Sequence, residues 1–327
     1  MALSAAALEL RSGRLTGTTT AAALGLHSYK SPLWAYKQIL DIGETKVTDP
    51  MEWGTRLEPV IAAKFAEKRG ITLTEMGTRQ HPEYPFWAAS GDFRIGPREA
   101  LEVKTAGRIQ KVDMWGRDDL DEDEYDNPYF DEMLAWGAEG SEDIPYEYIV
   151  QCAVQMAVFD LDAVWVAVLI GGNDYREYFR TRDLEFEEML AEGARLFYQN
   201  HILPRIPPPP RDTAELLSFL KDLYPSDDGT AIEPTPEILE SIERLRGYKA
   251  IAKDTKKLVD EETATIKAFL KESSQIGTGE KPLLTYKQAR SSYPTDWAAV
   301  ALATNPPAEL VKSHTAEKPG SRRLLVK

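Results

Sequence analysis

Three charged residues, Asp92, Glu102 and Lys104, interrupt two short apolar stretches of the sequence, where a core would ordinarily carry apolar side chains. In an extended strand, residues two apart share a face. Glu102 and Lys104 would therefore point to one side of their strand, and Val103 to the other side, into the core. Pairing of the two stretches around a turn would bring Asp92 beside Glu102. Two neighbouring carboxylates repel each other, and burial increases the repulsion.

A divalent cation would resolve this conflict, because Mg²⁺ and Mn²⁺ prefer hard oxygen ligands. The backbone carbonyl of Val103 could add a ligand to the carboxylates of Asp92 and Glu102. Lys104 could then orient a water or stabilise charge on a phosphate oxygen, and a metal-bound water is a better nucleophile because its pKa is lowered. This combination describes phosphodiester hydrolysis. A surface cross-strand salt bridge is the alternative for the same residues.

Further polar residues could join this cluster. Glu58 lies between apolar residues in a predicted helix over 51–69, and could face the same site or be an ordinary solvated glutamate. In a helix, Tyr148 and Gln151 are three residues apart and Gln155 is four further, so they share one face. Buried amides need hydrogen-bond partners. The row therefore indicates a site, although glutamines satisfied by nearby backbone explain it equally well.

The elements that must position these residues follow from the apolar pattern. Helices are predicted over 1–12, from a Thr18–Thr20 cap through Leu24, from Ser31-Pro32 onward, and over 51–69 up to Gly70. Strands are predicted at 71–76, 86–89, 93–95 and 101–104, then a buried helix over 144–161, strands at 163–172 and 175–182, and an amphipathic helix over 184–202. This order predicts an α/β fold whose mixed β-sheet is flanked by helices.

The C-terminal third differs from the rest. Four prolines at 207–210 cannot continue a helix and form a stiff connector. Residues 236–274 are charged and helical, as in an arm or a helical hairpin, and a strand over 282–288 and a basic tail at 321–327 follow. We predict a core domain at 1–206 with an acidic insertion at about 108–135, a Pro-rich connector at 207–235, and a C-terminal helical extension at 236–327.

Composition limits the classes of protein to consider. The 327 residues are 43% hydrophobic, which can fill a real core. No run approaches 18 apolar residues, so no membrane span is expected. The N-terminus lacks a charged region followed by an apolar one, so no secretory signal is expected. One cysteine, Cys152, excludes a disulfide framework and any cysteine-built metal site, and it fits a reducing cytosol.

The acidic charge is concentrated in one stretch. The net charge of −14 is unusual for a nucleic-acid binder. Residues 113–143, however, hold thirteen Asp or Glu against Arg117 alone, so −14 + 12 leaves −2 for the remainder. Such a block is usually a solvated loop. Basic residues that could contact DNA are Arg11, Arg14, Lys30, Lys37, Lys104, Arg108 and Lys111.

The set and order of these motifs resembles a known family. The stretches "LTGTTTAAALGLHSYKSPLWAYKQ", "MEWGTRLEPVIAAKFAEKRG", "HPEYPFWAASGDFRI", "ALEVKTAG" and "IPYEYIVQCAVQMAVFDL" are similar to the PD-(D/E)XK nuclease fold, with its restriction-endonuclease-like core. More narrowly, they resemble the YqaJ-type phage recombination exonucleases, relatives of lambda exonuclease, from about Arg11 to Ile202. Two departures are Ser90-Gly91 before Asp92, and Gln155 where related nucleases often have tyrosine.

The resemblance implies a role for each matching residue. Asp92 and Glu102 would bind the metal, Lys104 would be the catalytic lysine, and Glu58 would be an auxiliary acid and a further metal ligand. The remaining matches are Gln151 and Tyr148, which would orient the active-site residues or the scissile strand, and Arg11 and Thr18, which would hold a 5′ phosphate.

The resemblance also implies an activity. A Mg²⁺-dependent exodeoxyribonuclease, with Mn²⁺ as a substitute, would degrade one strand of linear duplex DNA in the 5′ to 3′ direction. It would act at double-stranded DNA ends as a homo-oligomeric ring, a trimer or another number, and supply single strands to an annealing recombinase. A phage-encoded enzyme of this kind works in the bacterial cytoplasm. The alternatives are an endonuclease of the same fold and an inactive DNA-binding module.

Overall fold

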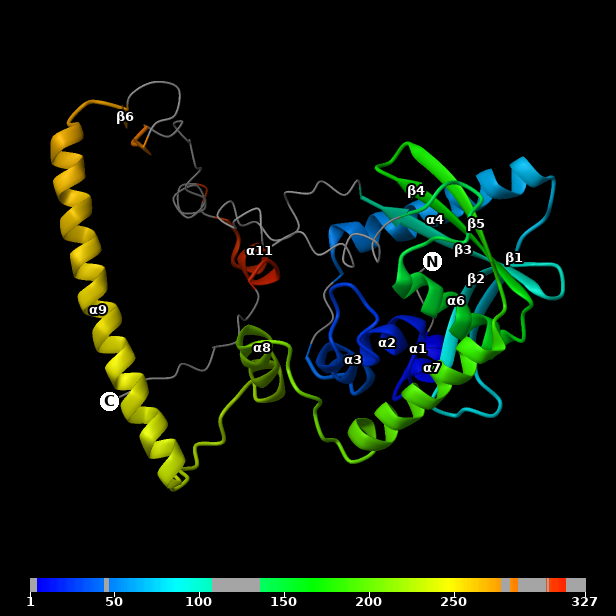
Figure 1. Ribbon diagram of the computed structural model, residues 1–327, viewed down its shortest axis with the longest axis horizontal. Helices are drawn as coiled ribbons and strands as arrows, with labels where there is room; N and C mark the ends of the chain where they lie inside the picture. Colours follow the sequence, from blue (N-terminus) through cyan, green and yellow to red (C-terminus); the bar gives the residue numbers. More distant parts are fainter. Residues whose placement is uncertain are drawn as a thin grey trace. The chain divides into compact units, whose positions relative to one another are not determined.

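The computed structural model describes residues 5–43, 47–107, 136–277, 283–287, 304 and 306–315 (Figure 1). The chain divides into two compact units, Met1–Tyr224 and Pro225–Lys327. The predicted acidic insertion at 108–135 lies outside the described residues. The segment predicted as a connector contains a helix, α8 (Thr213–Leu223), and the predicted boundaries at 206 and 235 stay a prediction.

A five-stranded mixed sheet forms the centre of the first unit. Its strands are β1 (Thr74–Gln80), β2 (Ala88–Ile95), β3 (Glu99–Ala106), β4 (Ala163–Ile170) and β5 (Asp174–Thr181), in that spatial order. The β3–β4 pair is parallel and the other three pairs are antiparallel. A parallel pair needs a long crossover, and the chain between β3 and β4 includes α6 (Tyr146–Phe159). The predicted α/β class with a mixed sheet flanked by helices is confirmed.

The described residues of this unit form seven further helical segments. They are α1 (Ala5–Arg11), α2 (Gly17–Ala23), α3 (Pro32–Ile39), α4 (Asp49–Arg69), α7 (Leu184–Phe197), the π-helical turn η2 (Tyr198–Ile202) and α8. Ser31 caps α3 by accepting a hydrogen bond from the Trp34 amide at 3.0 Å, as predicted.

Two local predictions were wrong. The cap of α2 is Thr16, which forms a capping box with Thr19, because Thr16 is the last extended residue before the helix. The predicted strands at 86–89 and 93–95 belong to one continuous strand, β2. Gly91 does not interrupt this strand, because it stays extended and pairs with Gly77 of β1.

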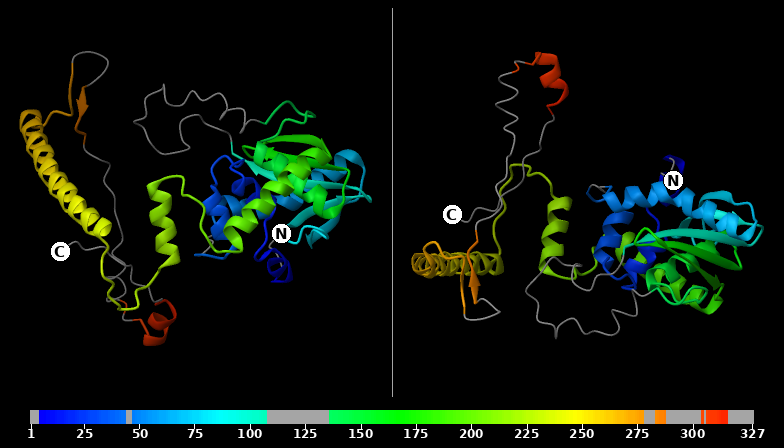
Figure 2. Two further views of the ribbon diagram at one scale, coloured as in Figure 1. Left: turned by 60° about the horizontal axis from the view of Figure 1, so that its bottom comes forward. Right: turned by 90° about the horizontal axis from the view of Figure 1, so that it is seen from above.

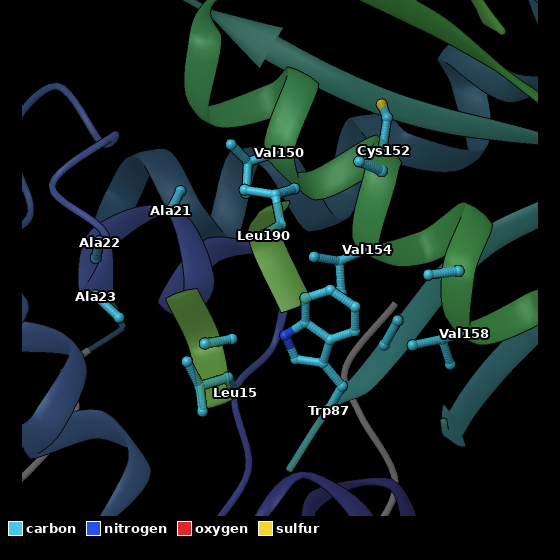
Figure 3. Close-up of a cluster of buried hydrophobic side chains, with 14 of the residues drawn as sticks. Leu15, Ala21, Ala22, Ala23, Trp87, Val150, Cys152, Val154, Val158 and Leu190 are labelled. Carbon is cyan, nitrogen blue, oxygen red and sulfur yellow. The ribbon is translucent and has the colours of Figure 1, made fainter. Parts of the chain in front are cut away.

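The two faces of the sheet are covered by different helices (Figures 1 and 2). On one face, Ile61 and Phe65 of α4 pack against Phe93 and Leu101. On the other face, a larger core joins α2, α3, α6 and α7 to the sheet. Figure 3 shows Trp87 lying against the α6 valines of this core, and the Trp87 indole N–H donates to the Thr20 hydroxyl at 3.2 Å. Each large side chain buried in this way stabilises the fold by about 1.5–3 kcal/mol.

The second unit contains a long helix, α9 (Pro236–Leu270), of 35 residues. A short antiparallel pair follows, β6 (Gln275–Ile276) with β7 (Leu284–Thr285), and then α11 (Ala308–Ser313). The sequence predicted either an arm or a helical hairpin here, and α9 is a single continuous helix, as in an arm. Within the described residues, no helix combines the length and the apolar composition needed to cross a bilayer.

Candidate active site

Strand β3 presents two kinds of side chain to its two faces. Leu101 and Val103 pack into the α4-side cluster, as the alternation predicts for Val103. Ala100 belongs to the core on the α6 side, so Glu102 and Lys104, which share its face, point toward α6. Glu102 is only 3% exposed. Two charged side chains are therefore held under a helix rather than in solvent.

Asp92 reaches this face from the neighbouring strand. The β2–β3 ladder pairs Phe93 with Leu101, and the Asp92 Oδ2 atom accepts a hydrogen bond from the Val103 amide at 2.8 Å. Burial and, next, the negative charge of Glu102 raise the pKa of the Asp92 carboxyl to about 8, although Lys104 and the Val103 amide oppose the shift. The two carboxyl groups thus lie close enough to disfavour each other's ionisation.

Glu102 accepts hydrogen bonds at both carboxylate oxygens. Its Oε1 atom accepts from the Lys104 ammonium at 2.5 Å and from the Gln151 amide at 2.5 Å. Its Oε2 atom accepts from the Gln155 amide at 2.6 Å. The Lys104 ammonium also donates to Gln151 Oε1 at 3.1 Å. Since a buried carboxylate is costly unless it is paired and hydrogen-bonded, this network offsets the cost of burying Glu102 and holds its side chain in one orientation.

Lys104 is a protonated group in this site. Burial lowers its pKa, but the charges of Glu102 and Asp92 raise it more, and the net pKa lies above the ordinary value. The Tyr148 ring covers the ammonium, with 5.0 Å between Lys104 Nζ and the ring centroid. The structure therefore brings together the predicted residues of β2, β3 and α6.

Tyr148, Gln151 and Gln155 form a row of polar side chains on one face of helix α6. Most other positions of this helix are buried apolar residues, and their packing fixes the rotation of the helix about its axis. Gln151 and Gln155 point toward β2 and β3, and the Gln155 amide also donates to the Ser90 carbonyl at 3.0 Å. The N-terminus of α2 packs directly on this row. A Cβ atom at Gly17 would lie 2.7 Å from the Gln151 Cα, so glycine is needed there for the two helices to approach.

Three predicted residues lie around this centre. Glu58 is half-buried on α4, and its charge contributes to the raised pKa of Asp92. Arg11 lies 3.5 Å from the Ser90 hydroxyl, measured from its Nη1 atom, and burial lowers its pKa. Thr18 is half-buried in α2, one residue after Gly17. Among the described residues, neither Arg11 nor Thr18 has a hydrogen bond to Glu102 or Lys104.

A second polar group, which sequence reasoning missed, lies beside Lys104. Glu147 is buried, and its Oε1 atom accepts from the Ser28 hydroxyl at 3.0 Å, while its Oε2 atom has no partner among the described residues. Burial raises the pKa of Glu147. Lys30, one of the predicted basic residues, lies 4.4 Å from the Trp34 ring, and burial together with Lys104 lowers its pKa to about 8. The sequence feature that could have identified Glu147 was its spacing, because it precedes Gln151 by four residues and so lies on the same helix face.

The donor set suits one kind of cation. Among the described residues, no group of three or more His, Cys, Asp or Glu side chains has the geometry of a complete metal site. Mg²⁺ needs no such cage, because it commonly binds one or two carboxylates and completes its coordination with waters and substrate phosphates. Asp92 and Glu102 meet this requirement, and the mutual repulsion of their carboxyl groups is what a cation would relieve.

Comparison with known proteins supports the sequence resemblance. Residues 8–162 match the YqaJ-like viral recombinase domain, which confirms the resemblance, although the match ends earlier than the predicted 202. Comparison with curated proteins gives no significant match.

The solved structures that are similar to this chain include three exonucleases. An alkaline exonuclease (LHK-Exo) from Laribacter hongkongensis is 18% identical, with 62% of this chain and 94% of that chain covered and a TM-score of 0.45. A phage related exonuclease from Haemophilus somnus 129PT is 10% identical, with coverages of 59% and 96% and a TM-score of 0.37. A putative exonuclease from Eubacterium rectale is 12% identical, with coverages of 73% and 98% and a TM-score of 0.37.

Proposed function

We propose that the YqaJ-like viral recombinase domain of this chain is a metal-dependent exodeoxyribonuclease. The observation that carries the proposal is the buried Glu102, held at both oxygens by Lys104, Gln151 and Gln155 and adjacent to Asp92. A surface salt bridge, the alternative for these residues, would be solvated and would need no amide donors. Degradation of one strand from the 5′ end, and delivery of the remaining strand to an annealing recombinase, follow from the family resemblance.

Each residue of the cluster then has a task. Asp92 and Glu102 would hold the cation, with the Val103 carbonyl and Glu58 as further ligands. The cation, Mg²⁺ or Mn²⁺, would supply Lewis-acid stabilisation of charge on the phosphate. Lys104, kept protonated by its carboxylate neighbours, would stabilise the negative charge that develops on the scissile phosphate.

The residues of α6 and the N-terminus complete the site. Gln151 and Gln155 hold the Glu102 carboxylate in place, so that its orientation does not depend on the cation. Tyr148 shields one side of the Lys104 ammonium from solvent. Arg11 and Thr18 would hold the 5′ phosphate of the DNA end, and Lys30 adds a second cation near Lys104.

The decisive experiment is digestion of linear and covalently closed circular duplex DNA in Mg²⁺, with and without chelator. We expect strand loss on linear DNA only, starting at the 5′ end of end-labelled substrate and stopped by chelator. Lys104→Ala should abolish it, whereas Lys64→Ala, at an exposed position of α4, should not. Full activity of Lys104→Ala would refute the site, and equal digestion of circular DNA would favour the endonuclease alternative. Binding without any hydrolysis would favour the inactive DNA-binding module.

A further inference from the structure

Helix α9 carries a strict seven-residue repeat of apolar side chains. Ile238, Leu245, Ala252, Val259 and Ile266 follow one another at intervals of seven over the whole helix. An ideal α-helix has 3.6 residues per turn, so such a repeat stays on one side only when helices wind around each other as a left-handed coiled coil. A helix of 35 residues is about 52 Å long, which is five heptads of contact.

Among the described residues of the second unit, no element covers this apolar seam along most of its length. Ile238 is 52% exposed and Val259 is 57% exposed. Three residues after members of the repeat, Tyr248 and Phe269 are also exposed. At the C-terminal end of the helix, the described strand β7 lies against Ile266 and Leu270 and leaves a cavity of about 180 Å³. The open seam therefore runs through the first four repeats.

The charges of α9 are arranged in blocks that complement each other. The helix has seven basic and seven acidic residues: 237–243 is acidic, 244–257 holds six basic residues and one acidic residue, and 260–262 is acidic again. A second copy of α9 aligned in parallel would place the basic block against itself. It would also bring Lys249 and Lys256, four residues after Leu245 and Ala252, each against its own copy, which is destabilising.

We propose that α9 pairs with α9 of a second copy of this chain as an antiparallel two-stranded coiled coil. In this orientation Lys249 of one helix lies next to Val259 of the other at the seam, instead of next to another lysine. Arg246 of each helix then lies across from Asp260 of the other, in two equivalent ion pairs. The acidic 260–262 block thus faces the start of the basic block at both ends of the pair.

The full-length chain tests this by light scattering coupled to size-exclusion chromatography. We expect the double variant Leu245→Glu/Val259→Glu to have half the mass of the wild type. Leu239→Glu is the matched control, because Leu239 is 51% exposed on the same helix but lies outside the repeat. It should keep the wild-type mass. An unchanged mass of the double variant would overturn the proposal, and so would an equal loss of mass in the control.

Cysteine pairing tests the orientation without disturbing the seam. Two single variants, Arg246→Cys and Asp260→Cys, are mixed and oxidised, and the native Cys152 is buried. We expect a disulfide-linked product that contains one chain of each kind. Self-linked Arg246→Cys alone would show a parallel pair and overturn the antiparallel arrangement, and the absence of any linked product would overturn the pairing. Neither result depends on nuclease activity.

Discussion

At the scale of single residues, Glu102 and Asp92 have different hydrogen-bond partners beside the same lysine. The Glu102 carboxylate accepts hydrogen bonds from Lys104 and from two side-chain amides. Asp92 receives one backbone hydrogen bond at 2.8 Å, and burial beside Glu102 raises its pKa to about 8. A site of this kind is organised for a cation and is strained without one, because one of its carboxyl groups must keep a proton.

Gln155 should matter because it is the described donor to one of the two Glu102 oxygens. Gln155→Ala leaves the buried Oε2 atom unsatisfied, which costs about 1.5–3 kcal/mol for a charged group. We expect the initial rate on linear duplex DNA to fall by about 10–100-fold. Gln80→Ala is the control, since the described partner of the Gln80 amide is the exposed Pro85 carbonyl. An unchanged rate for Gln155→Ala would show that Glu102 does not need this donor.

The Asp92 carboxyl should destabilise the folded protein when no divalent cation is present. Its carboxyl releases its proton near pH 4 in the unfolded chain and near pH 8 in the folded chain, so the folded state binds more protons between these values. The free energy of unfolding from this group therefore falls as the pH rises from about 4 to about 8. We expect Asp92→Asn to raise the melting temperature at pH 7 in chelator, by several degrees, while it abolishes hydrolysis.

The control for this prediction is Asp162→Asn. The Asp162 carboxylate accepts from Arg98 at the surface, at 2.6 Å, and this hydrogen bond lowers its pKa, so its loss should not stabilise the protein. If the melting temperature of Asp92→Asn stays at or below the wild-type value at pH 7, the Asp92 carboxyl is not strained in the metal-free protein.

At the scale of elements, the alternation in β3 and the spacing in α6 were enough to predict which residues share a face. Val103 does pack into the core, and Gln151 does turn toward Glu102. What single elements cannot reveal is the contact between elements that are far apart in sequence. The buried Glu147 belongs to the same row by spacing, but its partner Ser28 lies 119 residues away. Similarly, the continuity of β2 depends on Gly77 of the next strand.

The approach of α2 to α6 gives a prediction at this scale. Gly17→Ala places a methyl group 2.7 Å from the Gln151 Cα, against backbone that cannot yield easily. Overpacking of this kind costs about 1–3 kcal/mol, and the displaced Gln151 should lower the rate as well. Gly54→Ala in α4 is the matched control, because its new methyl group would lie 3.4 Å from the Thr105 hydroxyl. Equal melting temperatures and rates for the two variants would show that α2 does not position the glutamine row.

At the scale of the whole molecule, the two units differ in how much of their structure the apolar pattern of the sequence predicts. The first unit has buried clusters on both faces of its sheet, so apolar periodicity predicts its elements well. The second unit has one long helix, α9, whose apolar residues are largely exposed. There the apolar pattern predicts the helix, but it does not show which element packs against it. The heptad repeat is informative because a helix packed within its own unit has no need of a strict seven-residue period.

Removal of the second unit should separate hydrolysis from self-association. Every residue of the proposed active site lies in Met1–Tyr224, and this unit has its own core. We therefore expect a chain that ends at Tyr224 to fold and to hydrolyse linear duplex DNA in Mg²⁺ at a rate within about tenfold of the full chain. It keeps 224 of the 327 residues and loses its partner copy, so it should have about one third of the mass of the paired full-length chain by light scattering. A folded but inactive truncated chain would show that the second unit contributes to catalysis, because α9 would then do more than join two copies.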